Sequence, residues 1–492
     1  MINFFRQRLL NWVPKSFSVT LCAMLFSGVL FSLFPAPAGS QSNLPSMGEP
    51  ADSALSPREE QAIGRQLMRQ IRATLPLARD TQLEEYIDTL GQKLVQASGR
   101  QTGGFNFFII QDKAINAFAI PGGYIGVNQG LIEAMDYEEQ LAGVLAHEIA
   151  HVTQRHHART FATGKSRSLS AAATILAAIL IGQASPEAGQ AALAAGLAVT
   201  QQTSINFTRS NEIEADRIGI DILRSAEFDP TAMAESFAIL ERKNRLNTAG
   251  LQLEYLRTHP LDSKRIAEAS NRAANLSAKS RENQLDFRLF KARMDVLTSD
   301  DTAQQLQREN SKWRRKNSPE TAYALTLLHL QANRLDKAST WMQELSSRVK
   351  EHPTVSLLEA ELKAAKGDSS GSQKQLKTLH ALFPERFSIL EVLLDQVIDE
   401  RQLSEAKTLA TNYLRRTDNP HPSAYRTLAN VQQQLGEVAA SHEMLAYYFA
   451  EYDEYERAAN QLELALRHIA PGSQDELRLR ASLDVVRGVS PR

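Results

Sequence analysis

The C-terminal part of this chain repeats a short motif at a fixed spacing, and this feature constrains the fold more than any other. The motif is a large apolar residue followed three positions later by alanine, and it occurs at Leu335–Ala338, Leu403–Ala406 and Tyr455–Ala458. The first two copies are 68 residues apart, or two units of 34, which is the length of a helix-turn-helix repeat. Because the small alanine lets two helix backbones approach closely, we expect stacked helical pairs beyond about residue 283.

Turn residues in the same region support this interpretation. Gly367 and Gly436 fill the turn before such a second helix, and Pro384 follows one. The spacing is that of the tetratricopeptide repeat. The copies are degenerate, because the aromatic residue that is usual near the start of the unit is mostly missing, although Tyr425 fits. An ordinary helical bundle is the alternative.

The first 38 residues have the pattern of a secretory signal. Three basic residues and no acidic ones precede and flank an apolar stretch from Phe17 to Phe34, and Ala36-Pro37-Ala38 places small residues where a signal peptidase cuts. About 18 apolar residues could also just span a bilayer as an uncleaved anchor. Because an anchor has no use for the small-residue exit, we predict a cleaved signal peptide over residues 1–38 and an exported chain.

Cysteine usage limits the chemistry of the exported chain. The single cysteine, Cys22, lies in the apolar stretch and follows Leu21, whereas lipid attachment needs a small residue at that place. The mature chain therefore has no disulfide, no thiolate nucleophile and no cysteine-bound zinc. Any catalytic metal must be held by histidine and carboxylate. A net charge of −1 over 492 residues gives no indication of nucleic-acid binding.

Between residues 39 and 280 the pattern indicates a flexible leader and then a mixed α+β region. Residues 39–55 are rich in Ser, Pro, Gly and Ala. We expect helices over residues 56–75, 81–98, 138–157, 208–225, 230–246 and 263–276, and strands over 105–111 and on both sides of Pro121-Gly122-Gly123. Residues 158–204 are rich in Ala and Gly. They are interpreted as two tightly packed helices, with a mobile lid or a segment touching the membrane surface as alternatives.

One of these helices carries the sequence His147-Glu148-Ile149-Ala150-His151. Residues four apart lie on one face of a helix, so both imidazoles can bind one ion, with Glu148 as the base for an attacking water. A catalytic zinc needs three protein ligands. Glu212 is predicted as the third ligand, and Asp216, four residues later, as a hydrogen-bond partner that orients a ligating imidazole. The alternative, a solvated acidic helix face, fits Glu214 better.

The combination of His147-Glu148-x-x-His151 with Glu212-x-x-x-Asp216 resembles the M48 family of zinc metallopeptidases. In these gluzincins the third ligand is the glutamate of E-x-x-x-D. The resemblance implies an α+β, gluzincin-type domain with a small β-sheet over residues 56–280, one zinc ion per chain, and then an all-α tetratricopeptide-repeat domain over 283–492. Asn116-Ala117-Phe118-Ala119 resembles the edge strand of this family, and such a strand can bind an extended peptide.

Taken together, the signal peptide, peptidase domain and repeats resemble M48 peptidases of the Gram-negative periplasm that act in quality control of outer-membrane proteins. The resemblance implies a periplasmic endopeptidase that cleaves misfolded or stalled outer-membrane proteins and assists their assembly. Its implied partners are unfolded β-barrel proteins and the β-barrel assembly machinery, held by the repeats. The apolar stretch at residues 171–181 also favours peripheral contact with a membrane. The alternative function is a non-proteolytic scaffold or chaperone with an inactive or latent zinc site.

His259-Pro260 also matches the M48 pattern, and three roles stay open for His259. The first role is a hydrogen-bond donor to the oxyanion. The second is a ligand that fills the open zinc position and keeps the enzyme latent. The third is an ordinary residue that flanks a helix. His156 and His157 follow His151 by five and six residues, so on a continuous helix they lie off the ligand face. We expect both at the surface or behind the ligands.

Two residues near the predicted strands, Asn116 and Tyr124, are weaker candidates for substrate contact.

Overall fold

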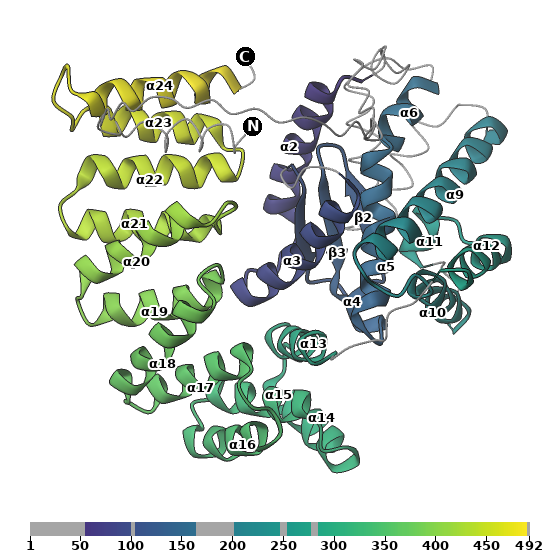
Figure 1. The fold of residues 1–492 in the computed structure, drawn as a ribbon, viewed down its shortest axis with the longest axis horizontal. Coiled ribbons are helices and arrows are strands. Elements are labelled where there is room, and N and C mark those ends of the chain that lie inside the picture. The colour runs from purple at the N-terminus through teal and green to yellow at the C-terminus, as the bar shows by residue number, and fades with distance from the viewer. Residues whose placement is uncertain (1–54, 100–103, 164–200, 247–252, 277–283, 490–492) are drawn as a thin grey trace, which may run out of the picture.

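The computed structural model describes residues 55–99, 104–163, 201–246, 253–276 and 284–489, and these form two parts that pack against each other (Figure 1). The first part combines helices with one small sheet, and the second is built of helices. The predicted signal peptide, most of the leader and most of the Ala- and Gly-rich segment lie outside the described residues. Among the described helices, none is both long and apolar enough to cross a membrane.

The first part begins with the two helices that the sequence predicts, α2 (Pro57–Thr74) and α3 (Thr81–Ala97). Ser56 and Glu59 form a reciprocal capping box at the start of α2, with proline in the first turn. Asp80 caps α3 by accepting a hydrogen bond from the backbone N–H of Leu83. Local capping chemistry therefore fixes where both helices begin.

The sheet has three strands, β1 (Asn106–Ile110), β2 (Ala117–Ile120) and β3 (Tyr124–Asn128), in the order β1-β3-β2. β1 runs parallel to β3, and β2 pairs antiparallel with β3 across the predicted Pro-Gly-Gly turn. Gly123 has φ +87°, and a Cβ there would lie 2.0 Å from the carbonyl oxygen of Gly104. β2 is an edge strand, and it packs against α5 (Glu138–Thr153).

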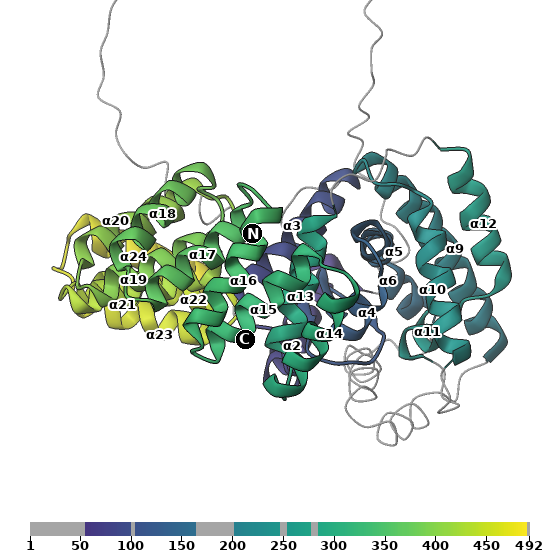
Figure 2. The ribbon, with the colours of Figure 1, turned by 90° about the horizontal axis from the view of Figure 1, so that it is seen from below.

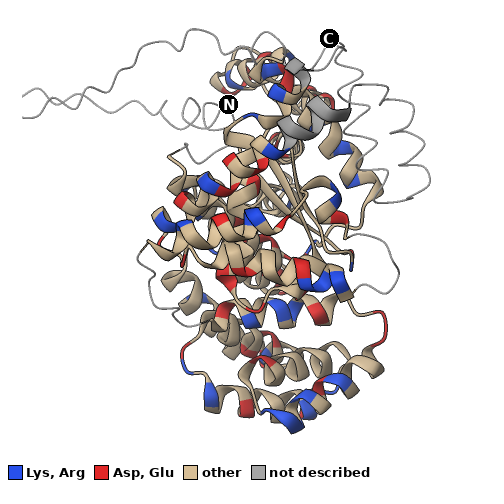
Figure 3. Cartoon of the chain, turned by 90° about the vertical axis from the view of Figure 1, so that its right-hand side faces the viewer, with Lys and Arg blue, Asp and Glu red and all other residues tan. Residues whose placement is uncertain are grey.

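Helix α5 is the centre of the first part, and every residue from Glu139 to His151 is buried. Figure 1 shows α5 between the strands β2 and β3 and the helices α9 and α12, and Figure 2 shows α9, α10 and α12 together on one side of α5. The remaining helices of this part are α4 (Gln129–Ala134), α6 (His156–Thr163), α9 (Gln201–Ser225), α10 (Ala232–Leu246), α11 (Glu254–Thr258) and α12 (Ser263–Ala274). On the face seen in Figure 3, acidic and basic residues are interspersed. The ion pairs Arg217–Glu268 and Arg272–Asp221 link α9 to α12.

The prediction of one helix over residues 138–157 is wrong. α5 ends at Thr153, and Arg155 adopts a left-handed conformation with φ 53° before α6 begins at His156. No glycine or proline marks this break in the sequence, and a non-glycine residue rarely adopts a positive φ. The side chain of Arg155 is held by Glu60 at 3.0 Å and donates to the Leu55 carbonyl, so contacts with distant residues stabilise the turn.

Helical pairs fill the second part, as the repeat spacing predicts. The pairs contain α13 (Leu285–Leu297), α14 (Thr302–Arg315), α15 (Pro319–Gln331), α16 (Leu335–Arg348), α17 (Pro353–Ala365), α18 (Ser369–Leu382), α19 (Phe387–Asp399), α20 (Leu403–Arg416), α21 (Pro422–Gln434), α22 (Val438–Glu451), α23 (Tyr455–Leu466) and α24 (Gln474–Val489). The first helices of five successive pairs begin at residues 285, 319, 353, 387 and 422, which are 34 or 35 residues apart. The alanines of the repeated motif are fully buried between helices.

Five turns in the second part share one geometry. A left-handed residue precedes the second helix at Asn333, Gly367, Arg401, Gly436 and Asp453, and the residue after it donates its N–H to a carbonyl five residues back. Only two of the five are glycine, which explains the weak sequence signal. The fifth turn follows the fourth by only 17 residues, because α22 is the second helix of one pair and the first of the next.

Helix α13 belongs to both parts of the molecule. Phe287, Phe290 and Met294 pack into the core of the first part, whereas Leu289 and Val296 pack into the core of the repeats. The opposite faces of one helix therefore join the two cores. A chain ending before α13 would lose three buried side chains from the core of the first part.

Polar contacts between the two parts involve α2, α3 and the start of β3. Glu85 accepts hydrogen bonds from the backbone N–H and the hydroxyl of Ser388, at 2.8 and 2.6 Å. The hydroxyl of Tyr124 donates to Asp453 in the α22–α23 turn at 2.5 Å. The structure therefore places Tyr124, a candidate for substrate contact, in the contact with the repeats.

Candidate metal centre

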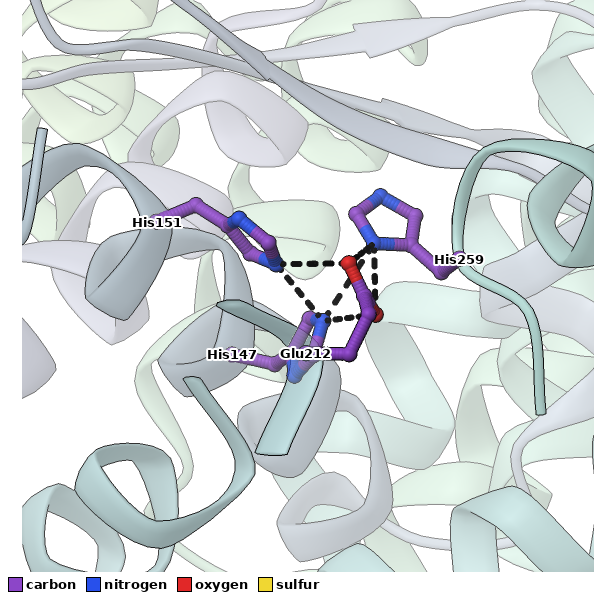
Figure 4. Close-up of side chains that lie close together, drawn as sticks. All are labelled: His147, His151, Glu212 and His259. Atoms are coloured by element: carbon purple, nitrogen blue, oxygen red, sulfur yellow. Dashed lines mark hydrogen bonds and ion pairs between the residues drawn. The ribbon is translucent and has the colours of Figure 1, made fainter. Parts of the chain in front are cut away.

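Four side chains from three segments converge in the first part (Figure 4). His147 and His151 come from α5, Glu212 from α9, and His259 from the residue that ends α11. One ligand atom of each lies within 4.8 Å of the others, and all four residues are buried. The structure thus brings together the three residues predicted as metal ligands, with His259 beside them.

The spacing of α5 and the packing of α9 create this convergence. His147 and His151, one helical turn apart, bring their Nε2 atoms to 3.0 Å. The two carboxylate oxygens of Glu212 divide between these nitrogens: Oε2 lies 3.4 Å from Nε2 of His147, and Oε1 lies 3.4 Å from Nε2 of His151. Gly219, on the same face of α9, lets the two helices approach, because a Cβ there would lie 3.2 Å from the backbone nitrogen of His147 and 2.6 Å from Met233.

Asp216 takes the place that the sequence predicts for it. Its Oδ1 lies 2.9 Å from Nδ1 of His147, which turns Nε2 of that ring toward the cluster. Arg265, on α12, donates two hydrogen bonds of 2.8 Å to Asp216 and lies 2.9 Å from Glu212. Arg265 is not among the residues predicted from the sequence. No sequence pattern marks it, since arginine in a helix is usually exposed.

His156 lies behind the second imidazole ligand. Its Nδ1 is 3.0 Å from Nδ1 of His151, and the two rings meet edge to face with centroids 4.8 Å apart. The expectation that His156 lies off the ligand face assumed a continuous helix. The left-handed turn at Arg155 instead brings the ring of His156 back toward His151. His156 therefore lies behind a predicted ligand, which was one of the two places expected for it.

The other residues singled out in the sequence have separate surroundings. Glu214 keeps a side chain that is 37% exposed, but it also lies 3.0 Å from Nε2 of His156 and 2.9 Å from Arg159. His157 contacts the carbonyl oxygen of Ala119 on β2 at 3.0 Å. Asn116 is buried, and within the described residues its side-chain oxygen has no hydrogen-bond partner. Its contact with substrate stays a prediction.

Electrostatics keep both carboxylates of the cluster ionised. Burial by itself raises the pKa of Glu212, but His259 and His151 beside it hold that pKa well below its usual value. Burial likewise raises the pKa of Asp216, and hydrogen bonds with Arg265 and His147 hold it below its usual value. Both groups are therefore anionic near neutral pH. Buried imidazole nitrogens with a carboxylate are a donor set that fits a divalent transition metal such as zinc.

Glu148 adjoins the cluster without belonging to it. Its side chain is 1% exposed, and within the described residues its Oε1 accepts no hydrogen bond. Nε2 of His259 lies 3.6 Å from this oxygen. A buried carboxylate oxygen without a donor is costly unless it has a partner in the working protein, and a water molecule is the simplest such partner.

His259 points into the cluster. Its Nδ1 lies 3.3 Å from both oxygens of Glu212 and 3.3 Å from Nε2 of His147. The ring of Tyr255 stacks on it with centroids 4.8 Å apart, and the backbone N–H of His259 donates to the Tyr255 carbonyl. This placement favours a role in the site over that of an ordinary residue flanking a helix.

Comparisons with known proteins agree with this geometry. Residues 81–273 match Peptidase family M48. The β-barrel assembly-enhancing protease of Escherichia coli K12 is 38% identical over 341 residues, which is 68% of each chain. The protein of that name from Yersinia pestis is 31% identical over 92% of this chain and 93% of its own. The mitochondrial metalloendopeptidase OMA1 of Schizosaccharomyces pombe is 32% identical over 37% of this chain and half of its own.

The contact between Asp216 and His147 generates a prediction. We expect Asp216→Asn to weaken zinc binding about 10- to 100-fold, because the neutral amide no longer holds the imidazole of His147 as a carboxylate does. Competition with a chelator on the full-length chain measures the affinity. Asp221→Asn is the matched control, because it makes the same change on the same helix in an exposed pair with Arg272. Equal affinity in both variants would contradict the role of Asp216.

Proposed function

This chain belongs to peptidase family M48, and from that premise we propose that it is a zinc-dependent endopeptidase in which His147, His151 and Glu212 hold the metal ion. Membership of the family makes it a metallopeptidase. One observation carries the finer assignment. Three candidate ligands from two helices meet in a buried cluster, beside a Glu148 oxygen that accepts no hydrogen bond within the described residues.

The chemistry of the residues supports peptide-bond hydrolysis. A bound zinc ion supplies Lewis acidity, which lowers the pKa of water and polarises a scissile carbonyl. Glu148 takes a proton from the attacking water at its free carboxylate oxygen and passes it to the leaving amine. Asp216 and Arg265 keep the ring of His147 in its ligating orientation, and the surrounding core excludes bulk water.

The scaffold alternative has less support. A metal site that only stabilises the fold has no use for a buried carboxylate such as Glu148 beside its ligands. Relatives of this chain are named proteases and metalloendopeptidases. The repeats can hold partners in a peptidase as well, so the two activities do not compete.

We further propose that the chain acts in the periplasm on misfolded or stalled outer-membrane β-barrel proteins and assists their assembly. This extends to the present chain what the name of its relatives, β-barrel assembly-enhancing protease, says of them. In this proposal residues 1–38 are a signal peptide, 56–280 the peptidase domain and 283–492 the repeat domain. The repeats offer a helical surface for β-barrel clients or for the assembly machinery.

Of the roles open to His259, we propose that of a fourth ligand that keeps the resting enzyme latent. A catalytic zinc needs one position open for water, and Nδ1 of His259 is close enough to the other ligand atoms to fill it. Its Nε2 faces Glu148, so the ring lies between the base and the metal position. Activity then requires this ring to move aside.

The role of Glu148 predicts a separation of catalysis from metal binding. We expect Glu148→Gln to lower turnover of an unfolded protein substrate by at least about 10²-fold, because the amide cannot accept the proton. Zinc content, measured on the same samples, stays at one ion per chain. Glu268→Gln, an exposed residue paired with Arg217, is the matched control and keeps full turnover. Loss of zinc from Glu148→Gln would contradict the assigned role.

His259→Ala separates the roles of that residue. Latency predicts that the turnover of His259→Ala rises above that of the unaltered chain, while zinc stays bound by the three other ligands. A fall in turnover would indicate an oxyanion donor instead, and unchanged turnover would indicate a residue that only flanks the helix. Turnover and zinc content measured together give the answer.

A trapping experiment tests the proposed clients. Full-length Glu148→Gln, purified gently from the native host, should retain outer-membrane β-barrel proteins or their assembly machinery more than the active chain does. The full-length chain is needed, since truncation before α13 removes Phe287, Phe290 and Met294 from the first core.

The matched control combines His147→Ala with Glu148→Gln, which removes a metal ligand but leaves the repeats unchanged. Proteins that are still retained bind the repeats, and those that are lost were held at the metal site. Recovery of the same abundant soluble proteins from every chain would contradict the proposed clients and leave a general metallopeptidase.

A further inference from the structure

The two imidazole ligands are supported in different ways. His147 has a carboxylate directly behind its Nδ1, that of Asp216, at 2.9 Å. His151 has a second imidazole behind its Nδ1, that of His156, at 3.0 Å. Behind His156 in turn lies Glu214, with Oε2 at 3.0 Å from Nε2 of His156. The second ligand thus reaches a carboxylate through one intervening ring.

The donor and acceptor atoms of the two imidazoles determine the direction of these hydrogen bonds. A neutral imidazole has one N–H donor and one nitrogen acceptor. If Nε2 of His151 binds a metal, its Nδ1 carries the proton and donates to Nδ1 of His156. His156 then carries its own proton on Nε2, which faces the carboxylate of Glu214. A single set of tautomers therefore satisfies all four ring nitrogens.

We infer that His156 is a positioning residue for the metal centre, which orients His151 by accepting its Nδ1–H, and that Glu214 fixes the tautomer of His156. This inference rests on the proposed metal site. Ligating histidines usually donate their second N–H to a carboxylate, carbonyl or water, and such partners strengthen metal binding. Here an imidazole supplied by another helix performs that task.

The surroundings hold His156 in place for this role. The residue is 3% exposed and begins α6 directly after the left-handed turn at Arg155. Arg155 is tied to Glu60, and the hydroxyl of Thr160 donates to the His156 carbonyl at 2.8 Å. Arg159, one helical turn from Arg155, pairs with Glu214 at 2.9 Å. The start of α6 is therefore fixed on both sides of the ring.

Three substitutions separate orientation of His151 from general packing. His156→Ala removes the acceptor, and we expect zinc affinity to fall about 10- to 100-fold. His156→Asn places an amide oxygen where Nδ1 was, so it accepts from His151 and recovers much of that loss. Glu214→Gln keeps the shape of the outer partner without its charge, and its side chain is partly exposed, so we expect only a few-fold decrease.

Combining the variants sharpens the test. An asparagine at position 156 is too short to reach Glu214, so adding Glu214→Gln to His156→Asn should cause no further loss. Zinc affinity is measured by chelator competition on the full-length chain, with thermal unfolding as the check on folding. A simple packing role predicts instead that asparagine binds zinc no better than alanine at position 156, and that result would overturn the inference.

Two controls distinguish failure of this inference from failure of the metal site. His157→Ala changes the neighbouring residue, whose ring contacts the Ala119 carbonyl, and should leave zinc affinity unchanged. His147→Ala removes a proposed ligand and should weaken zinc binding strongly. If His147→Ala weakens binding but His156→Ala does not, only the positioning role fails. If neither variant weakens binding, the metal site itself is wrong.

Discussion

The burial of polar side chains on α5 is the constraint on which the rest of the first part depends. His147 and Glu148 have almost no solvent exposure, in a helix whose residues 139–151 are all buried. Burying such groups is unfavourable unless each finds a partner. α9 supplies Glu212 and Asp216, and α12 supplies Arg265. The helices around α5 are therefore held by polar contacts as well as by apolar packing.

This arrangement explains why a site for chemistry can exist in the core of a folded domain. Arg265 neutralises carboxylates that would otherwise repel each other, and those carboxylates orient the imidazole of His147. The second imidazole is supported from α6 at the opposite side. Each proposed ligand is thereby held by neighbouring side chains, which lowers the entropy cost of assembling the site.

The repeats pack directly against the first part instead of being connected to it only by a linker. One helix, α13, contributes to both hydrophobic cores, and hydrogen bonds tie α3 and β3 to later repeats, as at Glu85–Ser388 and Tyr124–Asp453. A partner bound to the repeats would therefore lie at a defined place relative to the metal centre. That geometry suits a peptidase that holds a client before cleaving it.

The sequence by itself determined most of the described elements and the candidate ligands. Residue patterns predicted helices over 56–75 and 81–98, where the structure has α2 and α3, and the 34-residue spacing predicted the helical pairs. Helical spacing predicted that His147 and His151 share a face, and that Glu212 and Asp216 do too. These are local properties, because three or four residues of one helix decide them.

Only the tertiary structure decided which faces meet. Nothing near Arg265 or Tyr124 in the sequence indicates that one holds the proposed ligands and the other contacts the repeats. The break at Arg155, which turns His156 toward His151, has no glycine or proline to announce it. Contacts between residues far apart in the chain stabilise each of these features, and such contacts leave no periodic signal in a single sequence.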